Sequence, residues 1–128
     1  MQGRRSINFP GFSHQNPIPN ASRVGNIVMS SVIGGSNPGT RELPPTLEAQ
    51  VANVFHYIRA AVESAGGSPE HIVKIDFWVK DPATQREALN AEWLKMFPDA
   101  DARPARHTSA LPADSRALVQ AAFTAVLP

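Results

Sequence analysis

The sequence predicts an α+β domain in which two helices cover one face of a mixed or antiparallel β-sheet. Two segments place apolar residues at helical spacing, and several shorter segments alternate between apolar and polar residues. These segments follow one another in the order β-β-α-β-α-β-β, without internal repeats or a linker. A length of 128 residues with 42% hydrophobic residues suits a single domain, residues 1–128, with a sizeable core.

The first part of the chain is expected to form two strands separated by a long loop. Residues 6–9 suit a short strand, whereas residues 10–20 contain three prolines and little periodicity and therefore predict an irregular loop. Residues 23–33 are typical of a longer strand, with Gly25-Asn26 as a tight turn or bulge near its start. The glycine-rich segment 34–39 then predicts a turn.

The first helix is predicted from Thr46, a suitable N-cap, to Ala65, where two glycines end it. Its apolar stripe recurs at steps of three and four and consists of Leu47, Val51, Val54, Ile58, Val62 and Ala65. Residues 72–80 alternate in polarity and predict a half-buried strand whose inner face carries Ile75, Phe77 and Val79.

The second helix is predicted to open at Asp81-Pro82, an N-cap followed by a first-turn proline, and to run to about Met96. Its buried stripe consists of Leu89, Trp93 and Met96, and Phe97-Pro98 ends it. Two further strands are expected at residues 107–111 and 116–127, joined by a turn at residues 112–114.

The last predicted strand is apolar on both faces, which bears on assembly. The odd-numbered side chains from Ala117 to Ala125 face one way, whereas Leu118, Ala122 and Val126 face the other. Two helices can cover one of these faces but not both. We therefore expect another copy of the chain to cover the second face, so that the protein is an oligomer.

Composition and charge exclude several classes of protein. The 12 basic and 11 acidic residues leave a net charge of +1, so we expect no nucleic-acid partner. The absence of cysteine excludes disulfides, thiolate nucleophiles and zinc–thiolate sites. The four histidines show no ligand spacing with a carboxylate, so we expect no metal. No segment is typical of a signal peptide or a membrane span, and we expect a cytoplasmic protein without a membrane partner.

The segment from Arg103 to Thr108 holds the main candidate for chemistry. Pro104 cannot donate a backbone hydrogen bond and holds Arg103 extended, so Arg106 leaves a rigid corner and enters a predicted strand. The planar guanidinium of an arginine fixed in this way is well suited to binding a carboxylate or phosphate. Acidic residues just before Arg103 offer it ion-pair partners, and we expect a structural role for that side chain.

Several short segments occur in order along residues 23–126, namely Val24-Gly25-Asn26, Ala65-Gly66, Ile72-Val73-Lys74, Leu89-Asn90-Ala91-Glu92-Trp93, Arg103-Pro104-Ala105-Arg106 and Ala110-Leu111-Pro112. Together they resemble the reactive-intermediate deaminase family, also called Rid or YjgF and, in older usage, endoribonuclease L-PSP. The resemblance implies a chorismate-mutase-like protomer that assembles as a homotrimer with three intersubunit clefts. Active members of the family hydrolyse enamines and imines to keto acids and ammonia, without a cofactor or metal.

The resemblance therefore implies a hydrolase that deaminates a small carboxylate-bearing enamine, imine or related amino compound. Arg106 matches the family arginine that holds the substrate carboxylate, and Asn90 matches an asparagine that supports the cleft. Thr108 stands where the family has a cysteine, and strand alternation places it on the same face as Arg106. Ser31 stands where the family has a glycine whose backbone N–H binds substrate.

Two departures from the family pattern affect acid–base chemistry. Gln120 stands where the family has a glutamate, and it can orient a water molecule but cannot ionise. The family tyrosine has no clear counterpart, and Phe12 or Ile18 falls at its place. His14 or His107 could replace the lost acid–base group, although alternation points His107 away from the arginine's face.

Two alternatives stay open on the sequence. An arginine retained beside a glutamine-for-glutamate exchange also suits a non-catalytic trimer that binds a small anionic metabolite or a partner protein. Endoribonuclease activity is the weakest alternative, because the charge balance provides no basic groove and no catalytic pair of histidines, or of histidine and lysine, stands out.

Overall fold

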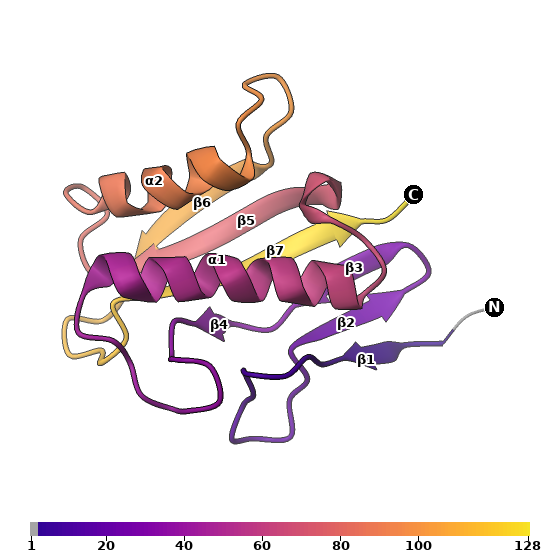
Figure 1. Ribbon diagram of the computed structural model, residues 1–128, viewed down its shortest axis with the longest axis horizontal. Coiled ribbons are helices and arrows are strands. Elements are labelled where there is room, and N and C mark those ends of the chain that lie inside the picture. Colours follow the sequence, from indigo (N-terminus) through magenta and orange to yellow (C-terminus); the bar gives the residue numbers. More distant parts are fainter. Residues whose placement is uncertain (1–2) are drawn as a thin grey trace.

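In a computed structural model, which describes residues 3–128, the chain forms a mixed seven-stranded β-sheet with two α-helices on one face (Figure 1). This arrangement confirms the predicted α+β class. In chain order the elements are β1 (Arg5–Ile7), β2 (Ala21–Val24), β3 (Ile27–Ser30), β4 (Ile33–Gly34), α1 (Leu47–Ser64), the 3₁₀ helix η1 (Pro69–His71), β5 (Ile72–Val79), α2 (Arg86–Met96), β6 (Ala105–Ala110) and β7 (Val119–Val126).

The topology places β6 at one edge of the sheet. The strands lie in the order β1-β2-β3-β7-β5-β6, and the short β4 also pairs with β7. β5 and β6 run parallel, whereas the other pairs of neighbouring strands in the described residues are antiparallel. Figure 1 shows α1 in front of the central strands and α2 beside β6. Because β6 is an edge strand next to a helix, some of its side chains can be reached by a ligand.

The first helix agrees with its prediction at both ends. The Thr46 hydroxyl accepts a hydrogen bond from the Ala49 backbone N–H at 3.2 Å, as an N-cap does. At the other end Gly66 adopts a φ of +98°, which an L side chain rarely tolerates, and the helix stops there. The predicted apolar stripe is buried from Val51 to Ala65 and packs on the sheet.

The expected tight turn at Gly25-Asn26 is confirmed, but residues 23–33 are not one strand, because they form a hairpin followed by a bulge. Gly25 turns the chain between β2 and β3 with a φ of +57°. After β3, the Ser30 hydroxyl accepts a hydrogen bond from the Phe123 N–H at 2.8 Å, so a side chain replaces the backbone in the ladder before β4 resumes it. β1 lies at Arg5–Ile7 rather than residues 6–9, since the Asn8 side chain instead accepts from the Asn20 N–H.

The predicted start of the second helix is also wrong, because α2 begins at Arg86 rather than at Asp81-Pro82. The Asp81 carboxylate accepts hydrogen bonds from the Ala83 N–H and the Thr84 hydroxyl, which closes a separate turn before the helix. β7 begins at Val119 rather than residue 116, and β6 at Ala105 rather than residue 107.

The two faces of the sheet differ in exposure. Side chains on the helix side form the core, where Phe77 of β5 stacks on Phe55 of α1 with ring centroids 5.6 Å apart. On the other side, which we call the open face, four apolar side chains remain 41–58% exposed, namely Val24, Ile27, Met29 and Val126. An apolar sheet face of this kind is typical of a surface that another subunit covers.

Candidate functional site

Arg106 lies on the edge strand β6 and packs on the helix side of the sheet. Strand register pairs it with the core residue Ile75. Its guanidinium carbon lies 5.1 Å from the centre of the Trp93 ring and 5.8 Å from the centre of the Phe77 ring. Contact with two aromatic rings holds the guanidinium in place and leaves its N–H groups for other partners.

Arg106 is a cation without an ion-pair partner in the part of the chain that the structure describes. Burial lowers the pKa of the Arg106 guanidinium from its ordinary value, and the nearby positive charge of Arg86 lowers it further. A partly desolvated cation beside another cation is stabilised when an anion binds to it. The geometry thus favours a negatively charged ligand at this edge.

Thr108 and Asn90 lie on the same side of the sheet as Arg106. Thr108 pairs with Phe77 in the parallel ladder, so its side chain shares the helix side with the arginine. Asn90 is exposed on α2, one turn before Trp93 and on the same side of that helix. We call Arg106, Thr108 and Asn90 the edge group.

Gln120 faces the other side of the sheet. It pairs with Trp78 of β5 and Gly34 of β4, and it is partly buried. It lines a cavity of about 380 Å³ together with residues of the loop before β2, among them Phe12, His14 and Ile18. We call Gln120, Phe12 and His14 the loop group. Arg106 and Gln120 therefore point to opposite faces of the sheet, and no edge-group residue lines the cavity of the loop group, so a single protomer does not bring the two groups together.

The loop that carries Phe12 is held firmly against α1. The hydroxyl of the buried Tyr57 donates to the Ser36 carbonyl at 2.6 Å. The centres of the Tyr57 and Phe12 rings lie 5.0 Å apart. Burial raises the pKa of Tyr57, against a smaller opposite effect of the bond to Ser36, so the hydroxyl stays a neutral donor. The Asn20 amide donates to the Phe12 carbonyl at 2.9 Å and ties the loop to the start of β2. Phe12 and Ile18, the two predicted counterparts of the family tyrosine, both line the cavity.

His14 is held by one ring nitrogen. Its Nε2 lies 2.8 Å from the Val32 carbonyl oxygen, which can only accept, so Nε2 carries a proton and donates it. Nδ1 is buried and has no hydrogen-bond partner among the described residues. With one nitrogen bound to a backbone carbonyl and the other buried, the ring has no free nitrogen for proton transfer in this arrangement.

Ser31 and Arg103 both use their donors within the chain. The Ser31 N–H donates to the Asn20 carbonyl at 3.0 Å, and its hydroxyl donates to the Pro19 carbonyl at 2.7 Å. The geometry therefore leaves no Ser31 donor for a ligand while these bonds hold. Arg103 is structural, as expected, but its Nε donates to the Phe97 carbonyl at 2.8 Å rather than pairing with an aspartate. His107 pairs with Asp76 and faces away from the edge group, as alternation predicts.

Two arginines near the candidate site were not predicted from the sequence. Arg86 opens α2 four residues before Asn90, a spacing that places both on one side of a helix, so this signal was present in the sequence. Arg41 lies in the loop after β4 and lines the same cavity as Gln120. No periodicity marks a loop residue of this kind, and its position depends on the tertiary fold.

Two structural findings concern residues 3–128 as a whole. No group of three or more His, Cys, Asp or Glu side chains in that range is arranged to hold a metal ion. Within the same range, neither helix is both long enough and apolar enough to cross a membrane.

Comparisons with known proteins agree with one another. The family model described as Endoribonuclease L-PSP matches residues 13–125. A RutC family protein of Haemophilus influenzae is 33% identical over 103 residues, which cover 77% of this chain and 78% of that protein. A RutC family protein of Aquifex aeolicus is 33% identical over 92 residues, or 72% and 73% of the two chains. Among solved structures, RidA from an Antarctic Psychrobacter has a TM-score of 0.82 at 27% identity, covering 96% of this chain and 99% of that one. Yeast Mmf1 has a TM-score of 0.86 at 17% identity, covering 98% and 100%.

Proposed function

Because the chain belongs to the Rid/YjgF family, described in its family model as endoribonuclease L-PSP, we propose that it hydrolyses a small carboxylate-bearing imine or enamine in a cleft between subunits. Deamination of enamines and imines is the activity of this family, and its members are generally oligomers that bind small molecules. One observation carries the proposal for this chain. The guanidinium of Arg106 is partly buried, rests on two aromatic rings and has no ion-pair partner among the described residues.

The proposed assembly is a homotrimer, which would supply what one protomer lacks. Arg106 and Gln120 lie on opposite faces of the sheet, so a site that contains both needs a second copy of the chain. The open face carries exposed apolar side chains that favour burial against another subunit. In a ring of copies, the edge group of one subunit would meet the loop group of the next.

The proposed reaction adds water across a carbon–nitrogen double bond. Arg106 binds the substrate carboxylate, and Thr108 and Asn90 add polar contacts beside it. Gln120 accepts a hydrogen bond from a water molecule and orients its oxygen toward the imine carbon. A carbon–oxygen bond forms, the carbon–nitrogen bond breaks, and the nitrogen leaves as ammonia with protons that come from the water. The other product is a 2-keto acid, and an enamine reaches the same path after tautomerising to the imine.

A non-catalytic binding trimer is the second candidate, and Gln120 favours it. A glutamine cannot take a proton from water, and of the two His14 nitrogens one is bound to the Val32 carbonyl and the other is buried. Because no protein base is in place, a protein that binds an anionic metabolite without hydrolysing it fits this arrangement equally well. Endoribonuclease activity has the least support, because the near-neutral charge provides little attraction for RNA.

Turnover of freshly generated 2-iminobutanoate tests the proposal. We expect the wild type to release ammonia faster than the uncatalysed reaction and to bind the product 2-ketobutyrate in calorimetry. Arg106→Ala should weaken that binding by about tenfold or more, because a charge-assisted bidentate contact is lost. Arg59→Ala, on the outer surface of α1 and paired with Glu63, serves as the control that keeps affinity.

Three results would count against parts of this proposal. Binding of 2-ketobutyrate without any rate enhancement would favour the non-catalytic trimer. Unchanged affinity in Arg106→Ala would contradict the carboxylate site. A wild type that stays monomeric in light scattering would contradict the intersubunit cleft.

A further inference from the structure

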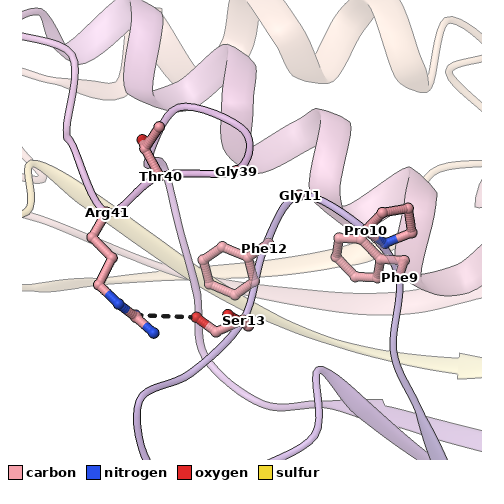
Figure 2. A pocket seen from close by; sticks show the side chains of 8 residues that line it. All are labelled: Phe9, Pro10, Gly11, Phe12, Ser13, Gly39, Thr40 and Arg41. Carbon is pink, nitrogen blue, oxygen red and sulfur yellow. Dashed lines mark hydrogen bonds between the residues drawn. The ribbon is translucent and has the colours of Figure 1, made fainter.

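Arg41 stands where two cavities meet. One cavity, of about 540 Å³, is lined by Phe9, Phe12, Ser13 and Arg41 together with neighbouring backbone (Figure 2). The other, of about 380 Å³, contains Gln120 and shares Phe12, Ser13 and Arg41 with the first. Figure 2 shows the arginine side chain reaching from its own loop toward the carbonyl of Ser13. Arg41 therefore borders the same space as the residue proposed to orient water.

The Arg41 guanidinium has no counter-ion in this space. Neither cavity has an aspartate or glutamate in its lining, and none of the ion pairs among residues 3–128 includes Arg41. Its one hydrogen bond within the described residues is a long contact of 3.5 Å from Nη1 to the Ser13 carbonyl. A guanidinium has five N–H donors, so most of them stay available to an anion.

The loop that carries Arg41 starts from a fixed backbone. The Gly39 N–H donates to the Gly11 carbonyl at 2.9 Å and joins this loop to the one that carries Phe12. Farther along, the Thr40 hydroxyl donates to the Asn37 carbonyl at 2.8 Å. The Asn53 amide on α1 donates to the Gly35 carbonyl at 3.0 Å. These bonds fix the backbone just before Arg41, from which its exposed side chain reaches the cavity.

We propose that Arg41 binds a second carboxylate of the substrate, so that the cleft prefers dicarboxylate imines. The inference rests on the function proposed above, in which Arg106 of the partner subunit binds the carboxylate beside the imine carbon. A substrate whose imine carbon lies near Gln120 extends its other end into the space that Arg41 borders. Among imines formed from the common amino acids, the anionic side chains are carboxylates, so the second group is a carboxylate rather than a phosphate.

Two 2-keto acids, one with a second carboxylate and one without it, test this inference. We would compare 2-oxoglutarate with 2-ketobutyrate by calorimetry at low salt, and the imines made from glutamate and 2-aminobutyrate by rates of ammonia release. The wild type should favour the dicarboxylate by about tenfold, the size expected of one charge-assisted contact. Arg41→Gln should bring this ratio close to one, Arg41→Lys should keep part of it, and the control Arg59→Gln should leave it unchanged.

The outcomes separate this inference from the proposed function. If 2-ketobutyrate binds or its imine is hydrolysed, but the dicarboxylate has no advantage, the role of Arg41 is wrong and the proposed function stands. If Arg41→Gln keeps the preference for the dicarboxylate, the proposed role of Arg41 is also wrong. This holds even if the variant changes the oligomeric state. If neither keto acid binds and neither imine is hydrolysed, both the proposed function and the inference fail.

Discussion

Mixing two inactive variants shows whether the site is shared between subunits. Arg106 projects to the helix side of β6, whereas Gln120 projects to the open face from β7. In a ring of three copies, a cleft would take Arg106 from one subunit and Gln120 from the next. Arg106→Ala and Gln120→Ala would then damage different halves of the same cleft, and each variant alone should have little activity.

The expected recovery follows from the ring geometry. The two variants are unfolded, mixed in equal amounts and reassembled. A cleft is then intact if the subunit that supplies Arg106 is a Gln120→Ala chain and the subunit that supplies Gln120 is an Arg106→Ala chain. Each condition holds for about half of the subunits, so about one quarter of the clefts should be intact. If both residues acted within one subunit, no intact site could form.

The assay is ammonia release from 2-iminobutanoate, with the assembly state followed by light scattering. A reassembled mixture of wild type with the double variant carrying both substitutions is the matched control, since it also contains about one quarter of intact clefts. Each variant reassembled alone should stay inactive. Mixed trimers that recover no activity, in a preparation where the control recovers its share, would refute the shared cleft.

Two further predictions concern stability and assembly. Tyr57→Phe leaves the Ser36 carbonyl without its donor and should lower the free energy of unfolding by about 1–3 kcal/mol in a urea titration, and an unchanged midpoint would contradict this. Burial raises the pKa of Tyr57 in the folded state. The contribution of Tyr57 to the free energy of unfolding is therefore fully present below the unfolded pKa of 10.0 and is lost as the pH rises through the higher folded pKa. Tyr57→Phe should not show this loss of stability at alkaline pH. Met29→Glu places a charge on the open face and should give folded monomers in light scattering and circular dichroism, whereas the control Ala52→Glu on the exposed side of α1 should keep the oligomer.

The elements that the sequence predicts well are those whose own residues carry the signal. α1 has a capping threonine, an apolar stripe over five turns and a terminal glycine, so its bounds follow from local chemistry. β5 alternates strictly from Ile75 to Val79, and its inner face is the one that is buried. The pairing of Arg106 with Thr108 on one face also followed from alternation alone.

Side-chain hydrogen bonds account for the boundaries that were wrong. Asp81 suits a helix N-cap, but it closes its own turn with Thr84, and α2 starts later. The Gln50 side chain accepts from the Leu118 N–H at 3.0 Å, which draws the segment before β7 toward α1 instead of leaving it in the sheet. Such contacts join residues far apart in the sequence, so no local pattern shows them.

The sequence by itself determined the fold class, the family and the arginine on which the proposed chemistry depends, because periodicity and local motifs carry that information. The tertiary structure alone decided that Arg106 and Gln120 lie on opposite faces of the sheet, since their relation depends on the register of β7, β5 and β6. It likewise brought Arg41 to the cavity of Gln120, through the packing of two loops held by Tyr57. Side chains distant in sequence meet where strands pair and loops pack, and that placement is a property of the folded chain.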